Sequence, residues 1–207
     1  MEIEWDFNSS GTDTKIDPKE FGLSIIPVST SKIPFKSWSE YQSTIAPIAL
    51  WHSHYINQGT VGIITGKISG SLECIDIDIK NDPTGKITTE YSNIIPPDLL
   101  KKLVIQSTPS GGQHFIYRCP DATIDKNLKL ALHSDRTVII ETRGEGGYFC
   151  TSKVNNKIMQ GVLDLENLYE DIPVITPDER NLLLDLARSL TRFFPTGNTS
   201  KNGEAFV

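Results

Sequence analysis

The alternation of apolar and polar residues predicts a chain built largely of short strands. The clearest period of two places isoleucines at positions 75, 77 and 79 on one face of a strand over residues 73–80, with Asp76 and Asp78 on the other face. Apolar runs of similar length predict further strands over residues 23–28, from residue 61, and over 103–107, 113–118 and 137–141. This succession of strands indicates a mixed, largely antiparallel sheet that is built from hairpins and flanked by helices.

Turn and cap residues predict how these strands are connected. Gly66 and Gly70 permit a positive φ, so the strand from residue 61 and the acidic strand are expected to form a hairpin. Residues 81–97 contain several prolines and are expected to form a loop that hangs off the sheet. Helices are predicted over residues 17–22, 46–56 and 98–102, and from a capping box at residues 176–179 along an apolar stripe that reaches residue 194.

Length and composition determine the expected domain organisation. A chain of 207 residues, of which 38% are hydrophobic and 22% charged, has room for one domain with a substantial core. We expect a loose N-terminal lead-in, a main domain, a C-terminal helical segment, and a linker or chain end, over residues 1–16, 17–160, 161–195 and 196–207 respectively. The polar final stretch indicates a chain cut from a longer polypeptide or one that leads into a linker.

Charge and cysteine content exclude several classes of protein. The net charge of −6 provides no global attraction for nucleic acid, so a polyanion has to meet a local basic patch or a bound metal. No apolar run approaches the roughly 20 residues of a membrane span, and the acidic N-terminus does not resemble a secretory signal. We therefore expect a cytoplasmic protein with no membrane partner, in which Cys74, Cys119 and Cys150 are reduced thiols in the core.

Candidate chemistry begins with the carboxylates of the acidic strand. On one strand face Asp76 and Asp78 are spaced by roughly 7 Å. If the two side chains rotate towards each other, their carboxylates are able to coordinate divalent cations, which lie about 4 Å apart in a two-metal site. Taken alone, such a pair is more often the solvated side of an edge strand.

Glu141 adds a third carboxylate where an apolar strand gives way to a glycine-rich turn. A solvated strand end explains this residue equally well when it is considered alone. Together with Asp76 and Asp78, however, it completes a set of oxygen ligands suited to two Mg²⁺ or Mn²⁺ ions.

Three further side chains are candidates for binding phosphate. His114 directly follows the glycine-rich turn at residues 110–112, whose backbone N–H groups are able to receive an anion. Arg143 lies two residues beyond Glu141. Lys32, in the loop over residues 29–38, is a weaker candidate because a loop lysine is usually just solvated.

These candidates fall into three motifs with a fixed order and spacing. The motifs are Ile75-Asp76-Ile77-Asp78, then Ser110-Gly111-Gly112-Gln113-His114, and finally Ile140-Glu141-Thr142-Arg143-Gly144-Glu145-Gly146-Gly147-Tyr148. In this order they resemble the archaeo-eukaryotic primase superfamily, specifically its bifunctional primase-polymerase branch found in plasmids, phages and mobile elements. Three motifs in register are far more specific than any one of them.

Weaker matches upstream extend the resemblance over roughly residues 20–155. These matches are Ile26-Pro27-Val28, Lys32, Trp38, Trp51, Gly62-Ile63-Ile64-Thr65-Gly66 and Ser69-Gly70. Two departures are visible: the third acid is Glu141 where many relatives have Asp, and Thr151-Ser152-Lys153 stands where relatives tend to show a Pro-Pro-Ser-like turn.

The resemblance implies an α+β fold with a mixed, largely antiparallel sheet and flanking helices, forming a two-part catalytic core that includes an RRM-like half. It implies template-directed nucleotidyl transfer from (d)NTPs, with single-stranded DNA as template and a primer to extend. Asp76, Asp78 and Glu141 would then hold the two metal ions, His114 and the glycine turn would bind the triphosphate, and Arg143 would contact phosphate or template. A C-terminal helicase or accessory domain of a longer chain is a further expected partner.

Two other functions fit the same residues. A metal-dependent phosphodiesterase or nuclease also uses an acidic cluster with two metals, but it needs a base that positions water, and the sequence supplies a histidine beside a glycine turn instead. A catalytically silent module that binds nucleotide or single-stranded DNA within a larger replication or defence protein fits the acidic composition. The intact acidic set favours an enzyme over a silent module, and the sequence leaves the choice between dNTPs and NTPs open.

Overall fold

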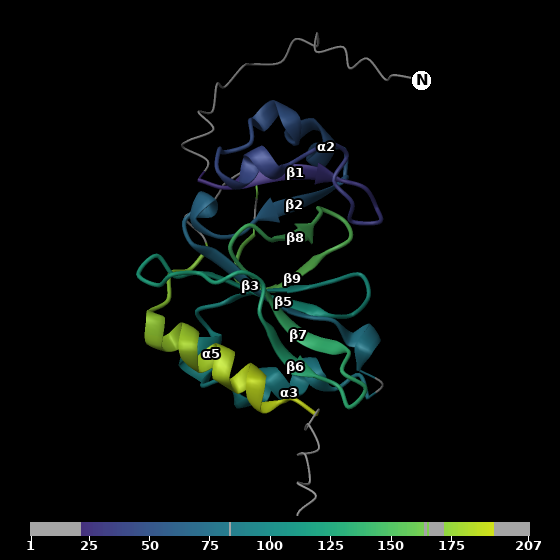
Figure 1. Ribbon diagram of the computed structural model, residues 1–207. Helices are drawn as coiled ribbons and strands as arrows, with labels where there is room; N and C mark the ends of the chain where they lie inside the picture. Colours follow the sequence, from purple (N-terminus) through teal and green to yellow (C-terminus); the bar gives the residue numbers. More distant parts are fainter. Residues whose placement is uncertain (1–21, 83, 164, 166–171, 193–207) are drawn as a thin grey trace, which may run out of the picture.

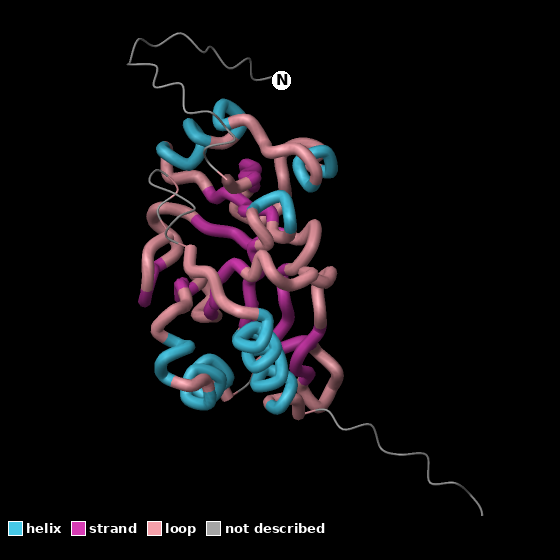
Figure 2. Tube along the Cα trace, turned by 90° about the vertical axis from the view of Figure 1, so that its left-hand side faces the viewer, coloured by secondary structure: helices cyan, strands magenta, loops and turns pink. Residues whose placement is uncertain are grey.

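The structure is a computed structural model that describes residues 22–82, 84–163, 165 and 172–192. The helix expected over residues 17–22 lies almost wholly outside the described residues, as do the lead-in at residues 1–16 and the segment 196–207. Figures 1 and 2 show the strands in the middle of the molecule, with helices at both ends.

The larger of two sheets has six strands and carries most of the motif residues. Its order is β6-β7-β3-β5-β4-β9, and every pairing between neighbours is antiparallel. The acidic strand β3 (Leu72–Ile77) lies inside this sheet, between β5 (Gln113–Arg118) and β7 (Val138–Arg143). The other members are β4 (Val104–Ser107), β6 (Lys129–Leu132) and β9 (Lys157–Gln160). Asp76 is therefore on an interior strand and not on a sheet edge.

The smaller sheet has three antiparallel strands in the order β1-β2-β8 (Figure 1). These are β1 (Ser24–Val28), β2 (Thr60–Ile64) and β8 (Tyr148–Thr151). The expected hairpin between the strand from residue 61 and the acidic strand is wrong, because β2 belongs to this sheet and β3 to the other. Gly66 and Gly70, with φ of 97° and 69°, flank a 3-10 turn, η3 (Lys67–Ser69), that carries the chain from one sheet to the next.

Helices cover the face of the large sheet that points away from the small one (Figure 1). The longest is α5 (Pro177–Ser189), which begins with the expected capping box between Thr176 and Glu179. Two shorter helices, α3 (Ile87–Ile94) and α4 (Pro97–Leu100), lie beside it. Together with the apolar residues on the facing side of the large sheet they enclose the main hydrophobic core, so the α+β class with a largely antiparallel sheet is confirmed.

Other helical segments differ from expectation. The helix predicted over residues 46–56 is interrupted at Trp51, which is buried between η2 (Ile48–Leu50) and α2 (His52–Ile56) with non-helical backbone angles. Two further 3-10 turns are η1 (Ser39–Gln42) and η4 (Ile79–Asn81). No helix in the described part of the chain is long and apolar enough to cross a membrane.

A second core fills the space between the two sheets. Leu72, Cys74 and Ile116 of the large sheet pack there with Ile63 and Phe149 of the small one. Alternate residues of β3 thus enter two different cores, Ile75 and Ile77 towards the helices and Cys74 towards the small sheet. The three cysteines are buried free thiols, as expected.

A buried ion pair joins α5 to β3 on the helix side of the sheet. The guanidinium of Arg180 donates to both carboxylate oxygens of Glu73, at 2.6 and 2.9 Å, and the hydroxyl of Tyr117 donates to the same carboxylate at 2.8 Å. Glu73 has no solvent exposure. Because every charge here has a hydrogen-bonding partner, the pair fixes the position of α5 beneath β3.

Asp82 explains why residues 81–97 are not the loop that their prolines indicate. Its buried carboxylate accepts hydrogen bonds from the backbone N–H of Ile87 at the start of α3, from Thr84, and from the guanidinium of Arg192. This cap acts from five residues away, so no local cap signature marks the start of α3. Burial alone raises the pKa of Asp82, but these hydrogen bonds outweigh burial and lower the pKa from its ordinary value of 3.8 to about 2.

We expect the substitution Asp82→Asn to reduce the free energy of unfolding at pH 7 by about 2 kcal/mol. Because the folded-state pKa is depressed, this contribution is present above the unfolded-state value of roughly 4 and is lost as the pH falls through about 2. Chemical denaturation at a series of pH values measures it: the parent should lose stability more steeply than the variant between these limits. The exposed Asp98→Asn serves as control, and parallel curves for parent and Asp82→Asn would contradict the assignment.

Candidate active site

A row of polar side chains crosses the large sheet at Asp76. In the antiparallel register, Asp76 of β3 lies directly opposite Glu141 of β7 and, on its other side, opposite His114 of β5. His114 is in turn opposite Gln106 of β4. Directly opposed residues share a sheet face, so four strands present these groups side by side on the face towards the small sheet.

Arg143 connects the two carboxylates of this row. Its Nη2 lies 2.8 Å from Oδ2 of Asp76 and 2.7 Å from Oε1 of Glu141, and its Nε donates to Asp76 as well. Arg143 is two residues beyond Glu141 on β7, which places both side chains on the same face. A single guanidinium therefore neutralises two acids that would otherwise repel each other across the strands.

Asp76 remains ionised because of these neighbours. Burial alone raises the pKa of its carboxyl group, but the hydrogen bond and charge of His114 and the charge of Arg143 outweigh burial and hold the pKa well below its usual value. For Arg143, burial lowers the pKa, and the charges of Asp76 and Glu141 raise it by more. The site thus holds fixed charges, with Asp76 mostly buried and Arg143 and Glu141 half-buried.

His114 is almost fully buried in this row. Its Nε2 lies 3.4 Å from Oδ1 of Asp76, and its ring packs edge-on against Phe149 of the small sheet at 5.5 Å between centroids. The second ring nitrogen, Nδ1, has no hydrogen-bond partner. Buried ring nitrogens normally have a partner, so Nδ1 is available for one further hydrogen bond.

Asp78 is positioned differently from Asp76. Strand β3 ends at Ile77, and Asp78 caps the 3-10 turn η4, accepting a hydrogen bond from the backbone N–H of Lys80. Its carboxylate also pairs with the ammonium of Lys80 at 2.6 Å. The structure therefore brings Asp76, Glu141, His114 and Arg143 together and leaves Asp78 with a separate counter-ion at the end of the same strand.

The turn at residues 108–112 packs against the end of β3. A side chain at Gly112 would collide with the carbonyl oxygen of Ile77, and one at Gly111, whose φ is 89°, would come within 2.7 Å of Ile79. The small residues of this motif therefore allow the turn to approach the backbone next to Asp78. The N–H of Gly111 donates to the carbonyl of Thr108 and is occupied within the turn, contrary to the expectation of a free donor.

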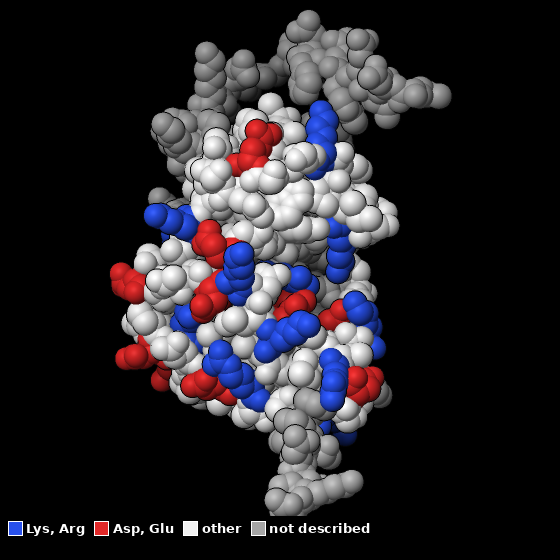
Figure 3. All heavy atoms as spheres, viewed as in Figure 1, with Lys and Arg blue, Asp and Glu red and all other residues white. Residues whose placement is uncertain are grey.

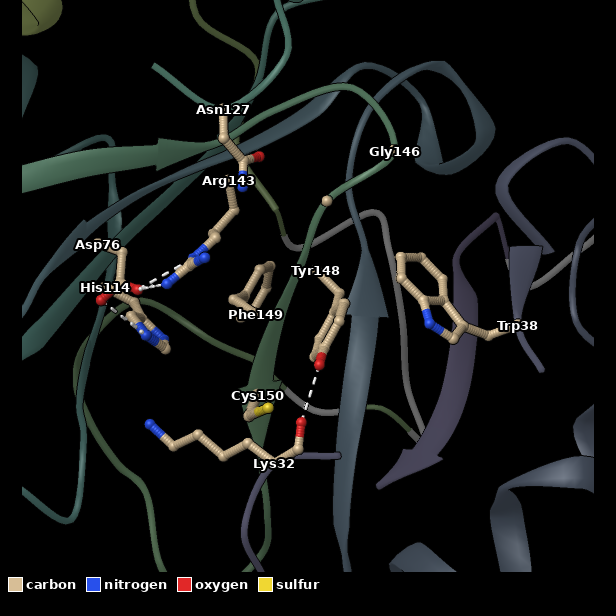
Figure 4. Close-up of a pocket in the computed structure, with 11 residues that line it drawn as sticks. Lys32, Trp38, Asp76, His114, Asn127, Arg143, Gly146, Tyr148, Phe149 and Cys150 are labelled. Atoms are coloured by element: carbon tan, nitrogen blue, oxygen red, sulfur yellow. Dashed lines mark hydrogen bonds and ion pairs between the residues drawn. The ribbon is translucent and has the colours of Figure 1, made fainter. Parts of the chain in front are cut away.

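The polar row opens into a pocket of about 310 Å³ between the two sheets (Figure 4). The predicted residues Lys32, Asp76, His114 and Arg143 line it, whereas Asp78, Glu141 and residues 110–112 do not. The remaining lining residues are Trp38, Asn127, Gly146, Gly147, Tyr148, Phe149 and Cys150. Figure 4 shows the Lys32 side chain extending towards His114 from the opposite wall.

Asn127 is a pocket residue that the sequence did not indicate. Its side-chain oxygen accepts a hydrogen bond from the N–H of Gly144 at 3.0 Å, and it lies so close to Gly147 that a side chain there would collide with it. It thereby fixes the glycine-rich turn that follows Arg143. Asn127 belongs to a loop without motif or periodicity, so only the tertiary structure reveals it.

Trp38 and Tyr148 form the wall opposite Arg143 (Figure 4). Their rings meet edge-on at 5.2 Å, and the Tyr148 hydroxyl donates to the carbonyl of Lys32 at 2.8 Å. Both residues belong to the sequence resemblance, and the structure adds their contact with each other. Burial raises the pKa of the nearby Cys150 thiol to about 11, which favours the protonated form at neutral pH.

The surface around the site carries no broad basic area. On the face shown in Figure 3, positive and negative side chains alternate over the large sheet, while the region over β1 and β2 is mostly uncharged. The described residues contain no group of three or more His, Cys, Asp or Glu side chains that could hold a metal ion. Among the residues that line the pocket, the cations Lys32 and Arg143 lie on opposite walls, and the carboxylate is that of Asp76.

Comparison with known families identifies the class of domain. The family described as "Bifunctional DNA primase/polymerase, N-terminal" matches residues 18–156, and the chain belongs to this family. Membership implies an enzyme of nucleotidyltransferase type with nucleotide and DNA substrates. A search among curated proteins found no match for the chain.

We expect Arg143→Gln to raise the pKa of Asp76 by about one pH unit or more, because the variant removes a positive charge in direct contact with the carboxylate. Side-chain carbon chemical shifts, followed by NMR during an acid titration, measure this pKa. Arg188→Gln, which removes an exposed arginine paired with Asp185 on α5, is the matched control and should leave Asp76 unchanged. An Asp76 titration that is identical in parent and Arg143→Gln would disprove the electrostatic coupling.

Proposed function

We propose that this chain catalyses template-directed nucleotidyl transfer, making primers and extending them from (d)NTPs. The observation that supports this most directly is the register that sets Asp76 opposite both Glu141 and His114 and lets the two carboxylates share one cationic group. The family membership supports the same class of reaction. The pocket volume lies at the lower end of the range for small-molecule sites, which suits a nucleotide that is partly exposed to a DNA strand.

The residues present fit divalent cations on chemical grounds. Asp76 and Glu141 already hold a cation between them, since the guanidinium of Arg143 contacts both, and hard ions such as Mg²⁺ or Mn²⁺ prefer carboxylate oxygens. Asp76, Asp78 and Glu141 would hold the two ions once Arg143 has moved away from Asp76 and Glu141, and Lys80 from Asp78. When bound, such ions supply activation of a hydroxyl nucleophile and neutralisation of a leaving pyrophosphate.

The chain's own cations suit the triphosphate. Arg143 and Lys32 approach the pocket from opposite walls, so an anionic group between them would meet positive charge on both sides. The unpartnered Nδ1 of His114 offers one more hydrogen bond in a site with little water to compete. Gly111 and Gly112 would contribute by letting the turn at residues 110–112 pack against Ile77 and Ile79 on either side of Asp78, and Ser110 holds this turn through its contact with the hydroxyl of Thr108.

We expect Asp76→Asn combined with Asp78→Asn to abolish primer extension, by more than about 100-fold, because both substitutions remove ligands for the ions that stabilise charge in the transition state. The assay incubates the chain with a labelled primer on a single-stranded template, each nucleotide class, and Mg²⁺ or Mn²⁺, and resolves the products on a gel. Asp185→Asn, on the exposed side of α5, is the control.

Each outcome of this assay separates the alternatives. Extension by the double variant equal to that of the parent would refute the catalytic assignment. Shortening of the labelled primer by the parent would favour the nuclease alternative, and nucleotide binding without any product would favour a silent binding module.

We expect His114→Ala to weaken nucleotide binding about tenfold, because a buried hydrogen bond to a charged phosphate is lost, and to change template affinity by less than about twofold. Calorimetric titration with a nucleotide and fluorescence anisotropy with single-stranded DNA measure the two affinities. His114→Asn keeps a side-chain nitrogen close to the position of Nδ1 and should recover part of the nucleotide affinity. A larger loss for template than for nucleotide would remove His114 from the triphosphate site.

A further inference from the structure

The loop between β1 and η1 presents apolar side chains to solvent beside the pocket. Ile33 and Phe35 are 64% and 57% exposed, the two highest values among the large hydrophobic residues that the structure describes. They flank Pro34 in a loop that bends at Phe35 and Lys36. Lys32 and Lys36, both exposed, stand immediately before and after this apolar pair. We call residues 32–36 the platform.

The backbone of the platform is held in place by hydrogen bonds. The N–H groups of Lys32 and Phe35 donate to the carbonyls of Ser29 and Pro27, and the N–H of Ser29 donates to the carbonyl of Ile33. Pro34 also forms an isolated bridge to Val28 of β1. The exposed side chains are therefore carried by a turn that is hydrogen-bonded to the end of β1, and little conformational entropy is lost when a ligand covers them.

The Phe35 ring is supported from behind. It meets the ring of His54 edge-on, at 5.4 Å between centroids and 89° between planes. Nε2 of His54 is in turn 2.9 Å from the carbonyl oxygen of Thr60, and Gly59 lacks the side chain that would displace this histidine. Phe35 is thus fixed in orientation while more than half of its surface remains open.

The platform is continuous with the wall of the catalytic pocket. The Tyr148 hydroxyl donates to the carbonyl of Lys32, and the Lys32 side chain lines the pocket itself. Trp38, a few residues further on, packs against Tyr148 on the same wall. A polymer that enters the pocket beside Lys32 would therefore pass over Ile33 and Phe35.

We propose that the platform binds unpaired nucleotides of the template strand next to the pocket. Phe35 and Ile33 would pack against the faces of bases, a contact that tolerates any sequence, and Lys36 would contact the adjoining phosphate. The chemistry favours nucleic acid over a protein partner, because lysine is depleted at the centre of protein interfaces whereas this apolar pair is bordered by a lysine on each side. The inference rests on the proposed function for the choice of template strand, and it gives this acidic chain a local contact for DNA.

The test measures the affinity of the full chain for a fluorescein-labelled single-stranded oligodeoxynucleotide by fluorescence anisotropy. Phe35→Ala should weaken binding about fivefold or more, because stacking on one base is lost. Lys36→Gln should weaken it and lower the salt dependence by about one phosphate contact. The matched controls Leu182→Ala and Lys101→Gln, exposed on the helix side, should leave the affinity unchanged.

A second variant distinguishes the loss of the aromatic ring from a local distortion of the loop. Phe35→Trp keeps a flat aromatic ring, so it should bind DNA at least as tightly as the parent, and its added fluorescence should be quenched on binding. Nucleotide affinity, measured by calorimetry without DNA, should be the same in Phe35→Ala and in the parent.

Two outcomes would overturn the proposal. One is unchanged DNA affinity in Phe35→Ala, and the other is a change in self-association, measured by sedimentation, without a change in DNA affinity, since this would assign the surface to a second copy of the chain. Failure of the proposed function gives a different result from both. If the parent chain binds DNA through Phe35 but extends no primer, the platform proposal stands and the proposed polymerase function is wrong.

Discussion

The site depends on the hydrogen-bonded register of strand β3 with its two neighbours. Because side chains alternate along a strand, a slip of one residue would turn Asp76 into the helix-side core and bring Ile75 or Ile77 into the pocket. Packing prevents such a slip, since each face of β3 enters a different hydrophobic core. Folding energy from the apolar residues therefore holds the polar row of Glu141, Asp76 and His114 in place.

The same register creates an electrostatic problem that Arg143 resolves. Two carboxylates directly opposite each other on neighbouring strands repel, and partial burial strengthens the repulsion. The guanidinium of Arg143 is stable between the two carboxylates because its planar group contacts both of them at once. In this structure the acids are thus paired with a side chain, and Asp78 with Lys80, so the protein supplies its own counter-ions at the site.

The sequence predicted what depends on local pattern. The period of two in the apolar residues predicted strands β3 and β5, and the capping box predicted helix α5. The spacing of the motifs placed Asp76, His114 and Glu141 in one site. It did not predict features that depend on distant partners. The start of α3 is capped by Asp82, five residues before Ile87, and β2 pairs in a different sheet from β3. Strand β9 has too little apolar alternation to be recognised in the sequence. Asn127 contacts a glycine turn that is distant in the sequence, so no local pattern marks it.

The ion pair between Glu73 and Arg180 shows that the unit that folds is longer than the unit that motif matching recognises. A chain ended after residue 156 would keep Asp76, His114 and Glu141, yet it would leave the carboxylate of Glu73 without its cation on the underside of the very strand that carries Asp76. An uncompensated buried charge costs about 3–5 kcal/mol, a large share of the stability of a domain this size. A helix that contains no residue of the pocket is in this way a structural requirement for the pocket.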